Sequence, residues 1–352
     1  MFAAAVIGGG VVGCHVAIHL AQRGYQVYLL EKNARVGQET STRNSGVLHA
    51  GIYYARDSLK ARLCVEGNAR SREFFAEWEV PFMPTGKYLI ARDAGEEAEL
   101  EALFGNARGN DVPGIERVSP ARLREEYPFI QCTAAFFSGT TGIVDAGEYM
   151  RTLYGLLDRH EVELLRECRA LHIGPGPVVE TDRGPLEADI VINAAGLYAD
   201  EIARSAGVNG YEIVPLKGDY LTTRSLRMKV PVYPVPTHGH GTLGIHLTPT
   251  FSGETLIGPS ETPSSGKDNY LAETPRAAFE ESLRGMIDAA TLASLRLDEG
   301  YSGNRPRAYL EGKRCEDFVI IRHPADVFHL IGIESPGLTA APAIAAHVYS
   351  MI

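Results

Sequence analysis

The chain contains few cysteines, and they form no pattern. Only 5 of its 352 residues are cysteine, and no two are spaced as C-x-x-C. An odd number without such spacing argues against a disulfide framework, so we expect reduced thiols and a cytoplasmic location. The histidines are scattered as well. Their one close pair, His238 and His240, lies among glycines that suit a turn, and we expect no metal site.

Long apolar runs and basic runs are also missing. No stretch reaches the roughly 18 uninterrupted apolar residues of a membrane helix. Residues 1–20 are mostly apolar, but glycines interrupt them and no basic segment precedes them, which is not typical of a signal peptide. A net charge of −10 and a pI near 5.6 argue against nucleic acid as a partner, while peripheral membrane contact stays open. Neither a G-x-S-x-G elbow nor a P-loop occurs, which disfavours the common hydrolases and kinases.

The chain does begin with a dinucleotide-binding fingerprint. An apolar stretch over residues 3–7 leads into Gly8-Gly-Gly10-Val-Val-Gly13, and Glu31 ends a second apolar stretch. The order of strand, G-x-G-x-x-G turn, helix, strand and acid is typical of a βαβ unit that binds a dinucleotide. Glu31 would accept hydrogen bonds from ribose hydroxyls.

Each glycine of this turn has a physical role. Gly8 allows the tight turn, Gly10 lets a pyrophosphate approach the backbone, and Gly13 lets the helix pack closely on the strand. The helix that opens at Val11 and Val12 has free N–H groups, which attract phosphate. The three glycines therefore predict a phosphate-binding turn.

The segment after the second strand favours FAD over a nicotinamide cofactor. Residues 37–54 are rich in Gly, Ser, Thr and Asn, with Arg43 and His49 embedded in them. A simple nicotinamide dehydrogenase would continue with another βα unit, whereas a long polar segment can wrap a larger cofactor. The alternative is an ordinary polar surface loop.

A series of short blocks along the chain follows a family pattern. These blocks are residues 44–54, 58–67, 86–90, 141–145, 191–200, 217–220, 243–248, 257–259, 301–306, 317–320 and 333–339. With the fingerprint, they resemble the D-amino-acid-oxidase-type FAD-dependent oxidoreductases. Within that superfamily they are similar to the branch of L-2-hydroxyglutarate dehydrogenases and oxidases. The resemblance covers essentially the whole chain.

The patterns and the resemblance together predict an α/β chain, α+β overall, with two interleaved domains. A Rossmann-like FAD-binding domain would take residues 1–80, 141–205 and 311–352, and an antiparallel-sheet substrate-binding domain residues 81–140 and 206–310. Apolar periodicity and capping residues predict helices over 58–77, 96–108, 119–126 and 145–160. They predict strands over 86–91, 211–223, 229–235, 242–248, 255–258 and 327–333, the last followed by a final helix.

The resemblance also implies which residues hold FAD. The strand at 188–196 ends in small residues, where the chain passes close to the nucleotide. Residues 337–339 open the last helix toward flavin N1 and the C2 carbonyl, where positive potential stabilises the anionic reduced flavin. The expected cofactor contacts are Gly8, Gly10, Val11, Val12, Gly13, Glu31, Lys32, Thr42, Arg43, Asn44, Ser45, Gly46, His49, Ala170, Ala194, Gly196, Arg305, Gly337, Leu338 and Thr339.

Oxidation of a hydroxy acid needs a base for the hydroxyl proton and cations for the carboxylates. His49 and His246 are the candidates for the base, because a neutral imidazole accepts a proton near pH 7. Arg305 is the candidate for a carboxylate, since its planar fork matches one bidentately. Lys217 would meet the distal carboxylate of a dicarboxylic substrate, and Tyr53 would supply a hydroxyl or pack on the flavin. Structural histidines and surface cations are the alternatives.

We therefore expect FAD-dependent oxidation of a 2-hydroxy acid, L-2-hydroxyglutarate to 2-oxoglutarate, by hydride transfer to flavin N5. An amino-acid or amine oxidase of the same superfamily is the first alternative, with Lys217 as the discriminating residue. A non-catalytic flavin-binding subunit is the second. The expected partners are a small dicarboxylate and an electron acceptor, which is oxygen, a quinone or an electron-transfer protein.

Overall fold

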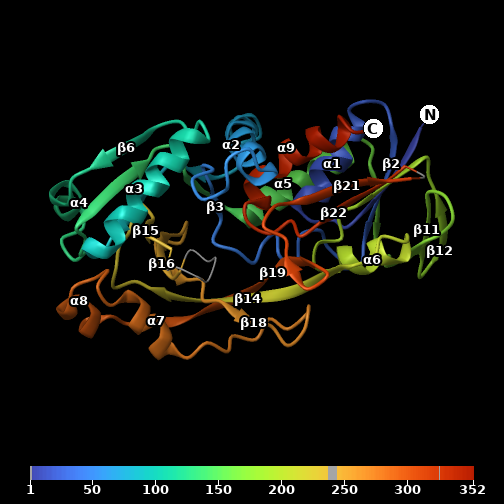
Figure 1. Ribbon diagram of the computed structural model, residues 1–352. Coiled ribbons are helices and arrows are strands. Elements are labelled where there is room, and N and C mark those ends of the chain that lie inside the picture. The colour runs from blue at the N-terminus through green and yellow to red at the C-terminus, as the bar shows by residue number, and fades with distance from the viewer. Residues whose placement is uncertain (1, 237–243, 325) are drawn as a thin grey trace.

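One sheet of the fold is built mainly from parallel strands. The computed structural model describes residues 2–236, 244–324 and 326–352 (Figure 1). The sheet has 6 strands in the order β21-β22-β13-β1-β2-β9, and only β21 and β22 run antiparallel to each other. Its strands are β1 (Ala3–Ile7), β2 (Gln26–Glu31), β9 (Glu163–Arg166), β13 (Ile190–Asn193), β21 (Val319–His323) and β22 (Val327–Ile331).

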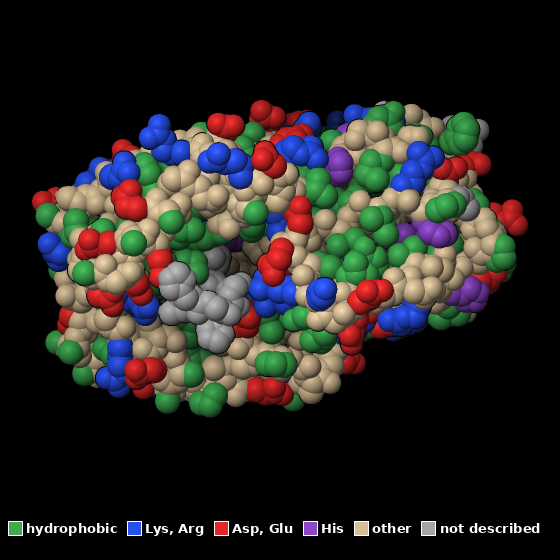
Figure 2. Space-filling view, viewed as in Figure 1, with side chains coloured by type: hydrophobic (Ala, Val, Ile, Leu, Met, Phe, Trp, Pro, Cys, Tyr) green, Lys and Arg blue, Asp and Glu red, His purple; other side chains and the backbone are tan. Residues whose placement is uncertain are grey.

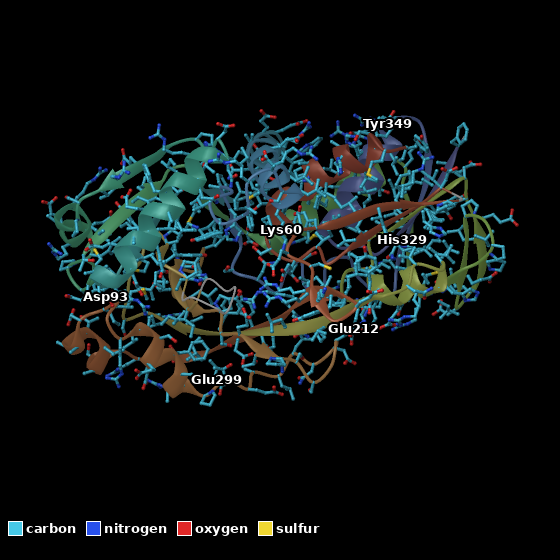
Figure 3. All side chains as sticks on the ribbon, viewed as in Figure 1. Lys60, Asp93, Glu212, Glu299, His329 and Tyr349 are labelled. Carbon is cyan, nitrogen blue, oxygen red and sulfur yellow. The ribbon has the colours of Figure 1, made fainter. Side chains whose placement is uncertain are left out.

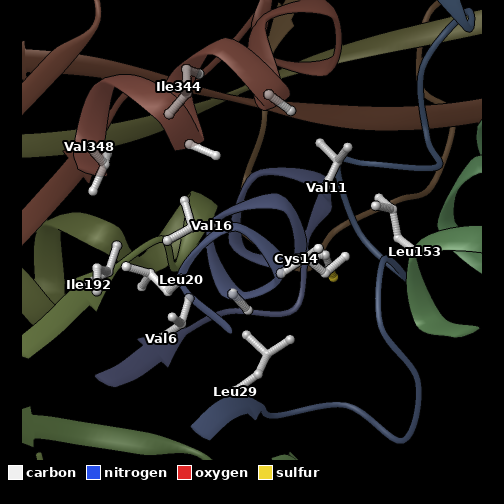
Figure 4. Close-up of a cluster of buried hydrophobic side chains, with 14 of the residues drawn as sticks. Val6, Val11, Cys14, Val16, Leu20, Leu29, Leu153, Ile192, Ile344 and Val348 are labelled. Carbon is white, nitrogen blue, oxygen red and sulfur yellow. The ribbon is translucent and has the colours of Figure 1, made fainter. Parts of the chain in front are cut away.

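Helix α1 (Val11–Ala21) connects β1 to β2 and packs within the main hydrophobic core. In Figure 4 its side chains lie between those of the strands, such as Val6 and Leu29, and those of α9 (Gly337–Tyr349), such as Ile344. Each fully buried side chain of this kind contributes about 1.5–3 kcal/mol. This packing holds α1 and α9 against each other.

Two further helices cover the same side of the sheet. Helix α2 (Leu59–Glu77) packs on α9, and α5 (Ala146–Arg159) packs on α1. Ser58 caps α2 by accepting a hydrogen bond from the backbone N–H of Ala61, as the serine cap of a helix should. In Figure 1 these helices lie together on one side of the long strand β14 (Tyr211–Thr223).

The second sheet has 10 strands and is almost wholly antiparallel. Its order is β20-β19-β14-β17-β16-β15-β5-β7-β6, with β18 paired to β14, and β15 with β5 is its parallel pair. Besides β14, its strands are β5 (Lys87–Ala91), β6 (Ile115–Val118), β7 (Ala134–Ser138), β15 (Val232–Pro234), β16 (His246–Pro249), β17 (Thr255–Gly258), β18 (Thr262–Pro263), β19 (Asp298–Leu310) and β20 (Lys313–Arg314).

Small elements complete the fold. Two three-stranded sheets are formed, β3-β8-β4 and β10-β11-β12. Their strands are β3 (Val47–Leu48), β4 (Phe82–Met83), β8 (Gly142–Val144), β10 (Ala170–Ile173), β11 (Val178–Thr181) and β12 (Gly184–Glu187). The remaining helices are α3 (Ala94–Gly109), α4 (Pro120–Glu126), the short 3₁₀ helix η1 (Gly196–Tyr198), α6 (Ala199–Ser205), α7 (Arg276–Leu283) and α8 (Ala289–Ser294).

The mixed α/β architecture and most of the predicted elements are confirmed. The four predicted helices correspond to α2, α3, α4 and α5, and the final strand and helix to β22 and α9. Helices α7 and α8 were not predicted, because they are short and lack a clear apolar period. Part of the strand predicted over 242–248 lies outside the described residues. The sheets interleave along the chain, while the domain boundaries stay a prediction.

None of the described helices combines the length and the apolar composition needed to cross a membrane. The cysteines are all free thiols, and Cys315 is the one that is not buried.

The contact between α2 and α9 can be tested with two glycine substitutions. A Cβ on Gly67 of α2 would lie 2.4 Å from the carbonyl oxygen of Thr339, whereas a Cβ on Gly105 of α3 would meet nothing within 4 Å. We expect Gly67→Ala to lower the free energy of unfolding by about 1–3 kcal/mol through overpacking. Gly105→Ala should raise it by about 0.5–1 kcal/mol. Denaturant unfolding measures both, and equal effects would contradict the observed packing.

Candidate active site

A large cavity lies between the two sheets. Its volume is about 1010 Å³, at the upper end of the roughly 300–1,000 Å³ typical of ligand pockets. On one side it is lined by segments that follow β1, β2, β13 and β22, and on the other by residues of β14, β16 and β19. The carboxyl ends of parallel strands are where α/β sheets bind ligands. The cavity is therefore the candidate active site.

The glycine turn after β1 leaves no room for side chains. Gly8 has φ +106°, and a Cβ there would lie 2.5 Å from the carbonyl oxygen of Ala194. A Cβ on Gly13 would lie only 1.9 Å from the carbonyl oxygen of Gly8. Gly10 is the N-cap of α1 and makes no side-chain capping bond. The N–H of Val11, the first residue of α1, donates to Ser41 Oγ at 2.9 Å. Val11 and Ser41 both line the cavity, so the start of α1 lies where a phosphate site requires it.

Glu31 is held beside this turn by two backbone bonds. Its Oε2 accepts from the N–H of Gly9 at 3.0 Å, and its Oε1 accepts from the N–H of Asn33 at 2.8 Å. Burial raises the pKa of Glu31, and the two backbone bonds partly oppose that rise. Each carboxylate oxygen keeps a further lone pair for a ribose hydroxyl.

Side chains of the segment after β2 hold its own backbone. Asn44 Nδ2 donates to the carbonyls of Thr40 and Ser41 at 3.0 and 2.8 Å, and its Oδ1 accepts from the N–H of Gly46 at 2.9 Å. These bonds curve the segment against the cavity. It is therefore a shaped wall, not the ordinary surface loop that the sequence left open.

The backbone at His49 is fixed from two helices. Its N–H donates to Thr339 Oγ1 at 2.8 Å, and its carbonyl accepts from Asn68 Nδ2 at 2.9 Å. Thr339 belongs to the first turn of α9 and Asn68 to α2. The imidazole of His49 is thereby positioned at the cavity.

The structure brings most of the expected cofactor contacts to one cavity. Those that line it are Gly10, Val11, Val12, Arg43, Asn44, Ser45, His49, Ala194, Gly196, Arg305, Gly337 and Leu338. Those that do not are Gly8, Gly13, Glu31, Lys32, Thr42, Gly46, Ala170 and Thr339.

Three residues of this second group lie in other parts of the fold. Thr42 Oγ1 donates to the carbonyl of Gly37 at 2.7 Å within the wall segment. Lys32 pairs with Glu39 and lies over the ring of Tyr198. Ala170 begins β10 in a small sheet.

His246 and His49 both face the cavity as neutral imidazoles. His246 Nδ1 lies 2.9 Å from the carbonyl of Gly244, so it carries the proton, and Nε2 is buried without a partner. Its ring stacks on Tyr233 at 3.6 Å between centroids. Burial, with a smaller effect of Lys87, lowers the pKa of His49 to about 3, and burial lowers that of His246 well below its usual value. Both can therefore accept a proton at neutral pH.

Arg305 offers a free guanidinium to the same cavity. It lies on β19 opposite Leu216, and its Nη1 is buried without a hydrogen-bond partner among the described residues. No carboxylate within the described ranges forms an ion pair with it. The missing side chain of Gly218 leaves room for it, since a Cβ there would lie 2.9 Å from Arg305 Nη2. A guanidinium with a buried, unpartnered nitrogen favours an anionic ligand.

The expectation for Lys217 is corrected by the structure. The residue alternates with Gly218 along β14, so its side chain points away from the cavity, which it does not line. Its ammonium donates to the carbonyl of Leu271 at 2.8 Å and pairs with Glu273 at 3.1 Å. The structure therefore does not place Lys217 at the cavity.

The structure also reveals a charged cluster that the sequence did not predict. Lys60 lies 3.1 Å and Arg307 3.3 Å from the carboxylate of Glu334, and Arg307 also pairs with Glu261 at 3.1 Å. Arg314 lies 4.0 Å from Glu334. Burial raises the pKa of Glu334, but these cations outweigh it and hold that pKa below its usual value.

This cluster belongs to the cavity wall. All five of its side chains line the cavity, and Figure 3 shows Lys60 near the centre of the molecule. Figure 2 shows a hollow near the middle of this face with charged side chains of both signs along its edge. Lys60 and Glu334 lie in blocks that carry the family resemblance, but nothing in the local pattern predicted that they meet.

No group of three or more metal-ligating side chains is present in the part of the chain that the structure describes. His238 and His240 lie outside that part.

Comparisons with known proteins agree with this geometry. The sequence pattern of the family described as FAD dependent oxidoreductase (DAO) matches residues 3–351. Two nematode proteins named mitochondrial L-2-hydroxyglutarate dehydrogenase are similar to the chain. The protein of Caenorhabditis elegans is 34% identical over 284 residues, which cover 75% of this chain and 64% of that protein. The protein of Caenorhabditis briggsae is 33% identical over 402 aligned residues, which cover 98% of this chain and 92% of that protein.

Two further similar proteins have names that refer to another substrate. A glycerol 3-phosphate dehydrogenase from Caloramator mitchellensis is 30% identical over 366 residues and covers 100% of this chain and 74% of its own length. The solved structure of L-α-glycerophosphate oxidase from Mycoplasma pneumoniae with FAD bound has a TM-score of 0.87 and 25% identity, covering 100% of this chain and 95% of that one.

The residues present fit FAD. The glycine turn is a cradle that side chains would fill, the start of α1 lies at the cavity, and the cavity exceeds the needs of a small acid alone. Gly10 and Val11 would hold the pyrophosphate, Glu31 the ribose, and the start of α9 at Gly337 the flavin pyrimidine edge.

The phosphate turn can be tested by adding a single methyl group. Gly13→Ala places a Cβ 1.9 Å from the Gly8 carbonyl oxygen, so we expect purified protein that has lost most of its FAD. Gly155→Ala is the matched control, because this α5 glycine has nothing within 4 Å of its Cβ position. The FAD-to-protein ratio is read from absorbance after gel filtration. Full flavin content in Gly13→Ala would show that the phosphate site lies elsewhere.

Proposed function

Because the chain belongs to the DAO family of FAD-dependent oxidoreductases, we propose that it oxidises L-2-hydroxyglutarate to 2-oxoglutarate. The names of the two nematode relatives support this substrate, and so does a cavity that combines an unpaired guanidinium with two neutral imidazoles. FAD, when bound, supplies the acceptor for the electron pair that leaves the substrate carbon.

The free guanidinium of Arg305 is the observation that carries the proposal. A bidentate bond from Arg305 to the 1-carboxylate would fix the substrate carbon that bears the hydroxyl group. Because Arg305 has no carboxylate partner within the described ranges, the incoming acid displaces no ion pair. The neighbouring charged cluster differs, since Lys60 and Arg307 are already paired with the carboxylate of Glu334.

The hydroxyl proton needs an acceptor on the same wall. His246 has the clearer arrangement, since its bond to the Gly244 carbonyl leaves the lone pair of Nε2 free toward the cavity. His49 Nδ1 is also buried without a partner. We propose that one of the two imidazoles takes the proton and that the other orients the hydroxyl group. The rate of flavin reduction by substrate is measured in His49→Gln and in His246→Gln. The variant with the slower reduction has lost the base.

Glycerol 3-phosphate is the second candidate substrate, because one relative and one structural neighbour are named for it. Anaerobic titration of the yellow protein distinguishes the candidates. We expect L-2-hydroxyglutarate to remove the oxidised-flavin absorbance, and glycerol 3-phosphate, L-lactate and neutral amino acids to act far more slowly. Faster reduction by glycerol 3-phosphate or by an amino acid would replace the proposed substrate, and no reduction by any of them would favour a non-catalytic subunit.

The electron acceptor and the cytoplasmic location remain predictions from the sequence. The nematode relatives are named as mitochondrial proteins. Reoxidation of the reduced enzyme by oxygen, by a soluble quinone and by an electron-transfer protein identifies the acceptor.

Replacement of the guanidinium by an ammonium tests the role of Arg305. Arg305→Lys keeps the charge but loses the two parallel hydrogen bonds, so we expect kcat/KM to fall by about 2–4 kcal/mol, or roughly 30-fold to 1,000-fold. The control is Arg224→Lys, an exposed arginine that pairs with Glu254, and neither residue lines the cavity. Steady-state kinetics with L-2-hydroxyglutarate measures both, and unchanged kcat/KM in Arg305→Lys would remove the residue from the site.

The lowered histidine pKa values predict an unusual pH profile. An imidazole accepts a proton only above its pKa, and the pKa of His49 is lowered to about 3. A histidine with an ordinary pKa would lose about tenfold in kcat/KM one pH unit below 6.5. We expect kcat/KM of this enzyme to fall by less than about twofold one pH unit below 6.5, since both imidazoles remain neutral. An acidic limb near pH 6.5 would contradict the burial of both rings.

A further inference from the structure

Lys87 is a buried lysine with no carboxylate partner. Lys60, Lys87 and Lys217 are the buried lysines within the described ranges. Lys60 pairs with Glu334 and Lys217 with Glu273, whereas no ion pair of Lys87 is found in the described part of the chain. The side chain of Lys87 is 0% exposed. Burial of an ammonium without a counter-charge is costly, so this placement needs an explanation.

Aromatic side chains surround the ammonium of Lys87 instead. Its Nζ lies 3.2 Å from the hydroxyl oxygen of Tyr53, 4.7 Å from the centroid of the Tyr53 ring and 4.4 Å from that of Tyr233. Tyr53 and Tyr233 both line the cavity, and Tyr233 stacks on His246. Lys87 itself, the first residue of β5, lies directly behind this wall.

The bond to Lys87 sets the direction of the Tyr53 hydroxyl. An ammonium can only donate, so the oxygen of Tyr53 accepts that bond and its own proton must point elsewhere. Burial raises the pKa of Tyr53 well above its usual value, so the hydroxyl stays protonated. Tyr53 can therefore donate to an anion in the cavity while Lys87 supplies positive charge behind it.

Two cations act on the charge state of the His246 imidazole. After burial, the charges of Lys87 and Arg305 are among the influences that lower the pKa of His246. Arg305 was assigned above to the 1-carboxylate. The Tyr53 hydroxyl with Lys87 behind it is a second place where negative charge would be stabilised. No carboxylate of the described residues pairs with Lys87, so a ligand would not have to displace one.

We propose that Lys87, acting through the Tyr53 hydroxyl, is the positioning residue that selects substrates with a second carboxylate. The proposal deepens the function proposed above and rests on it for the identity of the substrate. It assigns to Lys87 the role that the sequence suggested for Lys217. The expected ligand class is a short dicarboxylate, with one end on Arg305 and the other on Tyr53.

The charge state of Lys87 provides a readout that a purely structural role would not give. Burial lowers the pKa of Lys87 to about 7, and a bound carboxylate would raise it again. Dicarboxylate affinity should therefore be greatest in mildly acidic buffer and fall as the pH rises through 7.

The other titratable groups around Lys87 do not titrate in this window. Tyr53 and His49 belong to the segment after β2, Cys64 to α2, Tyr233 to β15 and His246 to β16. Burial raises the pKa values of Tyr53, Tyr233 and Cys64 and lowers those of His49 and His246.

The test is a comparison of glutarate with pentanoate, which has the same chain length and a single carboxylate. Both lack a hydroxyl group, so binding to the FAD-loaded protein can be measured by calorimetry without turnover. We expect wild type to prefer glutarate and Lys87→Met to reduce that preference by about tenfold to a hundredfold. The fall in glutarate affinity with rising pH should disappear in the same variant.

Two more variants make the result specific. Lys217→Met also removes a buried lysine, but away from the cavity, and should keep the glutarate preference. Tyr53→Phe should lose preference as Lys87→Met does, and the double variant should lose little more than either single one, because the two residues act as a unit. Flavin content and thermal unfolding verify that each variant is folded.

The proposal is overturned if wild type shows no preference for glutarate, if Lys87→Met keeps the preference, or if the losses in the double variant add. These outcomes are separate from those of the proposed function. Loss of glutarate preference in Lys87→Met without flavin reduction by L-2-hydroxyglutarate would support the Lys87 role and refute the substrate. Rapid flavin reduction with an unchanged preference in Lys87→Met would do the reverse.

Discussion

The close approach of α1 to the end of β1 is the constraint on which the rest of the structure depends. Because Gly13 has no side chain, α1 packs almost in contact with the Gly8 carbonyl, and its first residues, Val11 and Val12, line the cavity. Helix α9 packs on α1 and α2, so its own first turn is brought to the same cavity. Thr339 in that turn then fixes the backbone of His49. The nucleotide end and the catalytic end of the site are thereby linked through helix packing.

The cavity combines buried positive charge with neutral bases. Burial and nearby cations keep His49 and His246 deprotonated, while Arg305 and the Lys87–Tyr53 pair lack internal carboxylate partners within the described ranges. Groups of this kind are destabilising until a ligand pairs with them. The cluster around Glu334 differs, since its cations already have carboxylate partners. The cavity wall therefore favours an anionic ligand at Arg305 and at the Lys87–Tyr53 pair more than at the cluster around Glu334.

Local patterns predicted much of the fold and part of the site. The fingerprint could be read from sequence because each of its requirements acts over a few residues: a turn, a helix start and a strand end. The side chains of β14 could not be assigned in this way. Whether Lys217 or Gly218 faces the cavity depends on pairing with β19 and on the segment that supplies Glu273, both distant in sequence. Lys87 was overlooked for the same reason, since Tyr53 and Tyr233 reach it from other parts of the chain.

The central claim is that a dicarboxylate spans the cavity between two cations with the histidines beside its C2 atom. A crystal structure of the FAD-loaded protein with glutarate tests this most directly. The account predicts one carboxylate in bidentate contact with Arg305 and the other on the Tyr53 hydroxyl, in front of Lys87. Glutarate bound instead among Lys60, Arg307 and Arg314, or with neither carboxylate on Arg305, would contradict it.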